Sequence, residues 1–196
     1  MSKPLSTLPN PVESDANLTS ALAQIGAEVD NQPLRSSALV RIMRETFHGS
    51  DAGGAWDWRM AYDLMQAAAI QMLLRGGGAA GDIAVAKLLA SRLLTETRRL
   101  EQQIRLQQFS TPLPFAALAV QAAAIRKGET VLEPSAGTGA LAAFAARAGA
   151  TLVFNEIDPF RQRLLRAVFG GEVTGHDGEH IDDLLQTPVL PDVVVM

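Results

Sequence analysis

A short apolar run, a glycine turn and an alanine-rich helix follow one another directly in residues 131–148, and no other stretch constrains the fold as much. Residues 131–133 predict a buried strand, and residues 138–148 predict a helix. Between them Gly137 and Gly139 stand two apart, where the backbone adopts a positive φ or passes close to another group. A glycine turn that opens a helix presents free N–H groups to a ligand. A tight turn without a ligand is the alternative.

Beyond this turn the chain alternates short apolar runs with helical segments. Further strands are predicted at residues 151–155, 172–175 and 191–196, with a helix after Asp158-Pro159 and a helical turn at 181–185. Such alternation is typical of parallel βαβ units, and right-handed crossovers give the strand order 3-2-1-4. A ligand crevice then lies between strands 1 and 4, at their carboxyl ends. The predicted fold class is α/β, a partial Rossmann-like sheet preceded by an all-helical module.

The first half of the chain predicts helices rather than strands. Residues 1–16, rich in Pro, Ser and Asn, predict a flexible arm, and residues 17–107 predict a helical module. Its helices are predicted over residues 18–29, 36–47, 57–75 and 82–107, with N-caps at Ser36 or Ser37, Asp57 and Asp82. Thr111 as N-cap and Pro112 then start a nearly wholly apolar helix over residues 113–125, which we expect to pack on the sheet. The α/β domain is predicted to span residues 108–196.

Composition limits the function classes. The 196 residues are 47% hydrophobic, which suffices for a core, and the net charge of −4 gives no global attraction to nucleic acid. There is no cysteine, so disulfides, thiolate nucleophiles and cysteine zinc sites are excluded, and three scattered histidines predict no metal site. No apolar run reaches the roughly 20 residues of a membrane span, and the N-terminus lacks a signal-peptide pattern. We expect a soluble cytoplasmic protein.

Acidic residues stand where three predicted strands end: Glu133, Glu156 and Asp177. An acid at the tip of the second strand can accept hydrogen bonds from a ribose diol. Glu156 follows Gly137 by 19 residues, close to the roughly 20 typical of dinucleotide-binding folds. A nicotinamide cofactor and S-adenosyl-L-methionine share that ribose, so the glycine pair does not discriminate between them.

Residues 131–139, VLEPSAGTG, resemble the cofactor-binding loop of class I S-adenosyl-L-methionine-dependent methyltransferases, most closely the adenine-N6 DNA methyltransferases. Residues 108–112, QFSTP, are similar to the FxTP element of those enzymes, which contacts the methionine end of the cofactor. Residues 155–159, NEIDP, are similar to their second-strand tip. The resemblance implies that Glu156 binds the ribose, Ile157 packs on adenine and Asp177 contacts its amino group. The cofactor-binding residues it implies are Phe109, Ser110, Thr111, Pro112, Glu133, Pro134, Ser135, Ala136, Gly137, Thr138, Gly139, Glu156, Ile157 and Asp177.

The catalytic Asn/Asp-Pro-Pro-Phe/Tyr element of that family follows the fourth strand directly. Residues 191–196 resemble the strand before it, and the chain ends one residue short. The resemblance therefore implies no catalytic residue here and no methyl transfer by this chain alone. Residues 49–58, GSDAGGAWDW, look like the N-terminal part of bacterial strawberry-notch-like proteins, which couple a methyltransferase-like domain to a helicase-type ATPase. DNA would then be a partner through the rest of a longer parent protein.

Three functions remain open at this point. The first is an S-adenosyl-L-methionine-binding, DNA-methylation type domain. The second is a non-catalytic interaction module of a helicase-type protein, which the arginines at 98, 99, 105, 161, 163 and 166 motivate. The third is an NAD-binding Rossmann domain. In each case the fourth strand is an apolar sheet edge, which predicts self-association through that edge.

Overall fold

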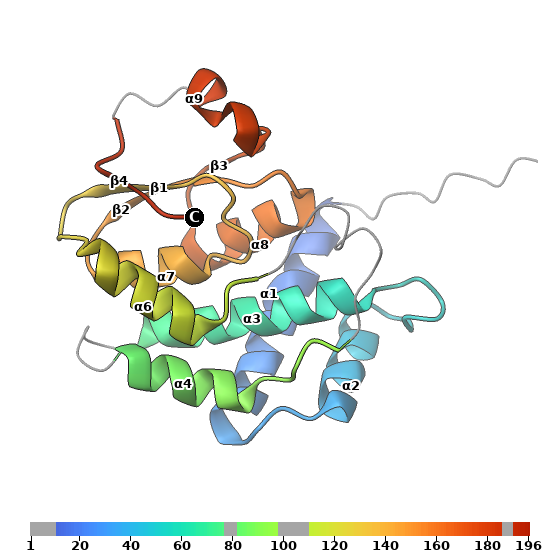
Figure 1. Cartoon of the computed structure of the whole chain (residues 1–196). Helices are drawn as coiled ribbons and strands as arrows, with labels where there is room; N and C mark the ends of the chain where they lie inside the picture. The colour runs from blue at the N-terminus through green and yellow to red at the C-terminus, as the bar shows by residue number, and fades with distance from the viewer. Residues whose placement is uncertain (1–10, 77–81, 98–109, 186–189) are drawn as a thin grey trace, which may run out of the picture.

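The computed structural model describes residues 11–76, 82–97, 110–185 and 190–196, and its elements form three layers (Figure 1). The lower layer is helical, and a middle layer of helices separates it from the sheet. The lower helices are α1 (Pro11–Asn31), α2 (Ser36–Thr46), α3 (Trp58–Arg75) and α4 (Asp82–Arg92). The middle helices are α6 (Leu113–Ala123), α7 (Ala140–Arg147) and α8 (Pro159–Phe169).

The sheet has four parallel strands in the order β3-β2-β1-β4, so the predicted order is confirmed. The strands are β1 (Thr130–Glu133), β2 (Thr151–Asn155), β3 (Val173–Thr174) and β4 (Val193–Val194). The short helices η1 (Gly178–His180) and α9 (Ile181–Leu184) follow β3. In Figure 1, α6, α7 and α8 lie on one face of the sheet and α9 lies on the other side. An α/β architecture preceded by helices is therefore established.

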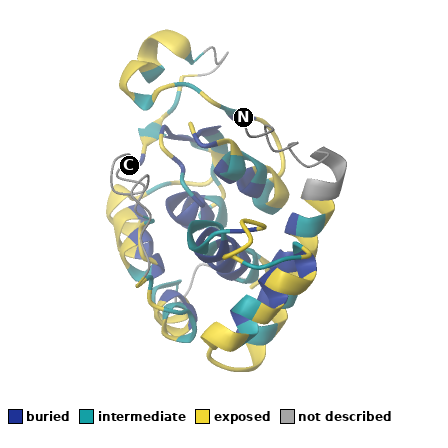
Figure 2. Cartoon of the chain, turned by 90° about the vertical axis from the view of Figure 1, so that its right-hand side faces the viewer, coloured by how far each residue is buried: buried dark blue, intermediate teal, exposed yellow. Residues whose placement is uncertain are grey.

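Helix α3 is the centre of the packing. Its apolar side chains, among them Leu64, Met65, Ile70 and Leu73, are buried, and it contacts α1 below and both α7 and α8 above. Most of the buried apolar residues form one cluster that runs from α1 through α3 to α7 and β1, and a smaller second cluster lies around Phe154 and Leu165. Figure 2 shows this as dark blue on the inward sides of the helices, with the exposed sides in yellow. The helical layer and the sheet consequently share a core, across the predicted boundary at residue 107.

Several predicted element ends differ from the structure. The first helix begins at Pro11, so the predicted arm of residues 1–16 is too long. Helix α4 ends at Arg92, and residues 93–97 are not helical, so the predicted continuation of this helix to residue 107 is wrong as far as residue 97. The rest of the predicted continuation lies outside the described residues. The caps of α2 and α6 are Arg35 and Pro112, without a side-chain hydrogen bond, instead of a serine and Thr111.

Two predicted caps are confirmed. The Asp57 carboxylate accepts a hydrogen bond from the Met60 amide at 2.7 Å, and that of Asp158 accepts from the amides of Phe160 at 2.9 Å and Arg161 at 3.1 Å. Pro159 after Asp158 occupies the first turn of α8, where a proline loses no helical hydrogen bond. This cap fixes the start of α8 directly behind the tip of β2.

One face of the sheet lies outside the core cluster. The register places Leu132 of β1 between Val153 of β2 and Val194 of β4, and none of these three residues belongs to that cluster. Val194 is exposed, as are Leu190 and Met196 beside it. The strand β4 is thus an apolar edge next to an apolar sheet face.

The turn between β1 and α7 has the predicted backbone, since φ is +57° at Gly137 and +86° at Gly139. A methyl group on Gly139 would lie 2.5 Å from Cε2 of Phe169 and 3.0 Å from Cδ2 of Leu165, both on α8. Among the described residues, only Arg161 Nη1 lies within 4 Å of the same position on Gly137, at 3.8 Å. The second glycine is therefore required by the packing of α8, independently of any ligand.

The first prediction concerns this packing. Gly139→Ala should lose about 1–3 kcal/mol more stability than Gly128→Ala, because overpacking adds to the cost of left-handed alanine. Gly128 is a matched control: its φ is +89°, and a methyl group there meets nothing within 4 Å. Urea denaturation followed by circular dichroism measures both. Equal losses at the two sites would show that the contact with Phe169 does not matter.

Candidate functional site

The carboxyl ends of β1, β2 and β3 are tied together by one buried amide, that of Asn155. Its Nδ2 donates to the carbonyl oxygens of Pro134 and His176, both at 2.9 Å. Its Oδ1 accepts from the His176 amide at 2.9 Å and from Thr174 Oγ1 at 2.8 Å. All four hydrogen-bonding positions of the side chain are used, so Asn155 sets how the loops after the three strands lie relative to one another.

Glu156, the next residue, turns its carboxylate toward the glycine turn. Oε2 accepts a hydrogen bond from the Gly137 amide at 2.6 Å, and Oε1 accepts from the Asp158 amide at 2.8 Å. The residue is only 5% exposed. Burial raises the pKa of Glu156, and these two amides oppose that rise. The predicted proximity of Glu156 and Gly137 is present, but in this conformation the carboxylate bonds the turn itself.

Three polar side chains of α3 reach this region, and sequence reasoning did not identify them. They are Arg59, Asp63 and Gln66, hereafter the polar stripe of α3, and their spacing of four and three residues places them on one helix face. Polar residues at helical spacing inside an otherwise apolar helix were the signal available in the sequence. Arg59 forms an ion pair with Asp158. Each member of the stripe thus has a partner near the strand tips or in the glycine turn.

The central member makes a fully buried ion pair. Asp63 accepts from Arg161 Nε at 3.0 Å and from Nη2 at 2.9 Å, and the side chains are 3% and 4% exposed. Burial raises the pKa of Asp63 against the charge of Arg161; burial also disfavours the Arg161 cation, but the hydrogen bonds and charge of Asp63 raise its pKa overall. The raised pKa of Asp63 favours its neutral form, whereas the raised pKa of Arg161 favours its charged form. Because two-bond arginine–carboxylate geometry favours the charged forms, we take the pair as ionised.

A cavity of about 440 Å³ opens beside the glycine turn. It is lined by residues of α3 and α4, by residues 93–96 after α4, by residues 110–113 at the start of α6, and by the first residue of α7. Among its lining residues are Gln66, Glu96, Ser110, Thr111, Pro112 and Ala140. Gln66 Oε1 accepts from Thr138 Oγ1 at 3.0 Å, and its Nε2 donates to Glu96. The structure therefore brings three predicted residues, 110–112, to the start of α7 although they are distant from it in sequence.

Glu133 lies beneath the turn rather than in the cavity. It is 4% exposed, and its Oε2 accepts from the Ala142 amide at 3.1 Å in the first turn of α7. Burial raises the pKa of Glu133 to about 8, with a smaller upward contribution from the charge of Glu156. A group buried to this extent holds the start of α7 on β1.

The remaining predicted residues are distributed around the turn. Ile157 is 56% exposed and Asp177 is exposed, with its carboxylate accepting from the Glu179 amide at 3.1 Å as the cap of η1. Pro134 accepts from Asn155, and Ala136 is buried with its amide donating to the carbonyl of Asn155 at 2.9 Å. Ser135 Oγ would lie 3.1 Å from a methyl group placed on Gly178, which puts the β3 loop beside the β1 loop. Phe109 lies outside the described residues.

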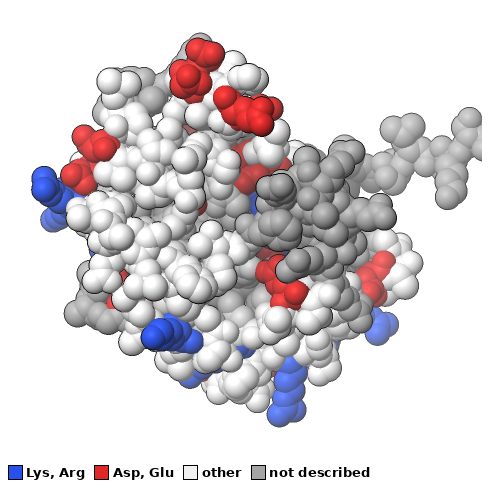
Figure 3. Space-filling view, in the orientation of Figure 1, with Lys and Arg blue, Asp and Glu red and all other residues white. Residues whose placement is uncertain are grey.

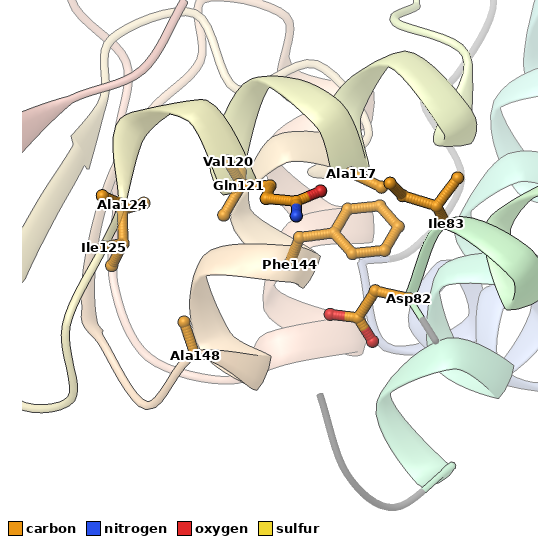
Figure 4. A pocket seen from close by; sticks show the side chains of 9 residues that line it. All are labelled: Asp82, Ile83, Ala117, Val120, Gln121, Ala124, Ile125, Phe144 and Ala148. Atoms are coloured by element: carbon orange, nitrogen blue, oxygen red, sulfur yellow. The ribbon is translucent and has the colours of Figure 1, made fainter. Parts of the chain in front are cut away.

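A second cavity, of about 370 Å³, lies between α4, α6 and α7 at the other end of α7. Figure 4 shows the ring of Phe144 at its centre, with Gln121 and Asp82 as its polar side chains and alanine, valine and isoleucine residues around them. Asp82 accepts from Arg147 Nε at 2.9 Å. None of the predicted site residues lines this cavity, so it plays no part in the site described above.

Comparison with known proteins gives no match, whether to a protein-family model, to a curated protein or to a solved structure. The helices that the structure describes include none long and apolar enough to cross a membrane. Functional inference consequently depends on the geometry of the strand tips and of the cavity beside them.

A second prediction follows from the buried Glu133. Its pKa is raised in the folded protein, so its contribution to stability is fully present below pH about 4.5 and is lost as the pH rises to about 8. Glu133→Gln keeps an acceptor for the Ala142 amide and carries no charge. The variant should match the unaltered protein near pH 4.5 and be more stable at pH 9, by on the order of 5 kcal/mol at most. Thermal unfolding across this pH range tests it, and parallel profiles would contradict it.

Proposed function

We propose that this chain is an S-adenosyl-L-methionine-binding, methyltransferase-like domain of the adenine-N6 DNA methyltransferase type, with a Rossmann-like sheet. The observation that carries the proposal is the meeting of residues 110–112 with the start of α7 at a cavity of about 440 Å³. Ligand pockets typically measure about 300–1,000 Å³, so the size is suitable. The glycine turn and the acid of Glu156 lie at the carboxyl ends of the central strands, where ligands of open α/β sheets bind.

The residues present fit the two ends of such a ligand unequally. At the cavity, Ser110, Thr111 and Gln66 supply hydroxyl and amide groups suited to a polar amino-acid end. At the tip of β2, the Glu156 carboxylate already accepts from two amides, and a ribose diol would have to share or displace them. When bound, the cofactor supplies an electrophilic methyl group, and the chain's residues supply position and charge. Catalytic methyl transfer by this chain alone is not part of the proposal.

Six arginines motivate the interaction-module alternative, and those at 98, 99 and 105 lie outside the described residues. Arg161 is buried against Asp63, and Arg166 Nη2 donates to the Val173 carbonyl at 2.9 Å and to Gln162. These two side chains therefore serve internal contacts. Figure 3 shows the few Lys and Arg residues of the described part of one face widely separated. The strawberry-notch-like resemblance implies that a DNA contact comes from the rest of a longer protein.

Calorimetric titration with S-adenosyl-L-homocysteine tests the proposed function, and is the third prediction. We expect saturable binding, with at least tenfold weaker affinity in Glu156→Gln, because an amide is a poorer acceptor for a diol than a carboxylate. Glu172→Gln is the matched control: it makes the same change on an exposed side chain outside the predicted site, and should leave the affinity unchanged. NADH should not compete. A folded sample that takes up no S-adenosyl-L-homocysteine at millimolar concentration would reject the proposal.

The fourth prediction concerns the edge of the sheet. We propose that this chain self-associates through β4, whose outer side carries exposed Val194 beside Leu190 and Met196. Light scattering on a concentration series should show mass rising above that of the monomer. Val194→Lys places a charge on the apolar face next to this edge and should lower the association. Val85→Lys, an equally apolar exposed site on α4, is the control and should leave association unchanged. A monomer at all concentrations would contradict this proposal.

A further inference from the structure

The polar stripe of α3 holds a cation close to the acid of the candidate site. Arg161 contributes its guanidinium from the first turn of α8, and its Nη1 is the nearest atom to a methyl group placed on Gly137, at 3.8 Å. Glu156 Oε2 lies 2.6 Å from the amide nitrogen of that same glycine. The arginine and the glutamate therefore both lie close to Gly137. Burial raises the pKa of Glu156, and the nearby charge of Arg161 is one of the contributions that oppose this rise.

Geometry decides which carboxylate takes the guanidinium. Asp63 engages it through two hydrogen bonds, at 2.9 and 3.0 Å, with both side chains almost fully buried. Glu156 meanwhile uses its two oxygens on the amides of Gly137 and Asp158. Two-point arginine–carboxylate pairs are among the strongest and most directional hydrogen-bonded contacts. Asp63 thus accepts two hydrogen bonds from the guanidinium, while the Glu156 oxygens accept theirs from two backbone amides.

Stability alone does not account for such a pair. Desolvation of two buried charges costs about as much as their attraction returns, and apolar pairs of similar size are often as stable. A buried pair that fixes an arrangement is a better explanation, and here the arrangement is that of a glycine turn and an acid at the strand tips. Two further contacts of α3 hold it against the same region: Arg59 pairs with Asp158 after β2, and Gln66 accepts a hydrogen bond from Thr138 in the glycine turn.

We infer that Asp63 is a positioning residue of the ligand site: by binding Arg161 it keeps that cation off Glu156, so that the Glu156 carboxylate stays available for the hydroxyl groups of a nucleoside ligand. The inference rests on the proposed function, and it means that α3 contributes a positioning residue to the ligand site. Without the Asp63 charge, we expect the Arg161 guanidinium to pair with Glu156, which lies beside the same glycine, and to draw it away from Gly137.

The fifth prediction uses two variants of this pair, titrated with S-adenosyl-L-homocysteine. Asp63→Asn should weaken binding about tenfold or more, because the released guanidinium competes for Glu156. Asp63→Asn with Arg161→Gln removes that competing cation and should return the affinity to within about threefold of the unaltered protein. A role in folding alone gives the opposite order, since the double variant loses more native contacts. Asp82→Asn, which breaks the largely buried pair with Arg147 at the far end of α7, is the control and should bind normally.

Amide hydrogen exchange provides a readout that needs no ligand. In Asp63→Asn, the Gly137 amide loses its acceptor and should exchange about tenfold faster, whereas the Ala142 amide, bonded to Glu133, should not change.

Where Asp63→Asn does not fold, the reversed pair Asp63→Arg with Arg161→Asp replaces it: it keeps an ion pair but sets an acid beside Glu156, and should bind S-adenosyl-L-homocysteine weakly. Unchanged affinity and exchange in a folded variant would overturn the inference. Failure of the unaltered protein to bind S-adenosyl-L-homocysteine, with faster Gly137 exchange in Asp63→Asn, would reject the proposed function and leave the positioning contact standing.

Discussion

The buried ion pair between Asp63 and Arg161 links the helical layer to the strand tips, and the arrangement of the candidate site depends on it. Asp63 belongs to α3, which packs between α1 and the helices α7 and α8, whereas Arg161 belongs to the first turn of α8 behind β2. Removing one partner of such a pair leaves an uncompensated charge in the core, which commonly costs 3–5 kcal/mol. The pair therefore restricts α3 to one position relative to the glycine turn. The apolar contacts of α3 stabilise its packing against the other helices, and the ion pair fixes its position relative to the glycine turn.

The shared core explains why the helices cannot be treated as a separate appendage. Apolar side chains of α3 pack against α1 on one side and against α7 and α8 on the other, so the same helix closes both halves. A ligand site formed at the edge of the sheet then has one wall from each half. The cavity beside Thr138 illustrates this, since Gln66 and Glu96 come from the helical layer and Pro112 comes from the segment before α6. Substitutions that shift α3 or the segment after α4 should therefore change the shape of this cavity.

Much of the sheet could be predicted from the sequence, because its signals are local. Strand order follows from alternation and crossover handedness, and the Asp158 cap follows from an acid before a proline. The site was predictable only in part. Glu156 and Gly137 are brought together by the strand tip and turn that the sequence indicates, but the partners of Asp63 and Gln66 are nearly a hundred and about seventy residues away along the chain. No local pattern specifies such pairings, which arise from how whole helices pack. The early end of α4 likewise reflects tertiary contacts, since Leu94 donates its amide to Met65 of α3.

The two glycines of the turn carry different information about function. Gly139 is enclosed by Phe169 and Leu165, so packing explains it completely and it gives no support to a ligand. Gly137 has a positive φ, and among the described residues only the Arg161 guanidinium lies within 4 Å of a methyl group placed on it, so packing against these residues does not explain the absence of a side chain. Asparagine or aspartate would also tolerate a φ of this sign. Gly137 is therefore compatible with the proposed close approach of a ligand, whereas Gly139 gives that proposal no support.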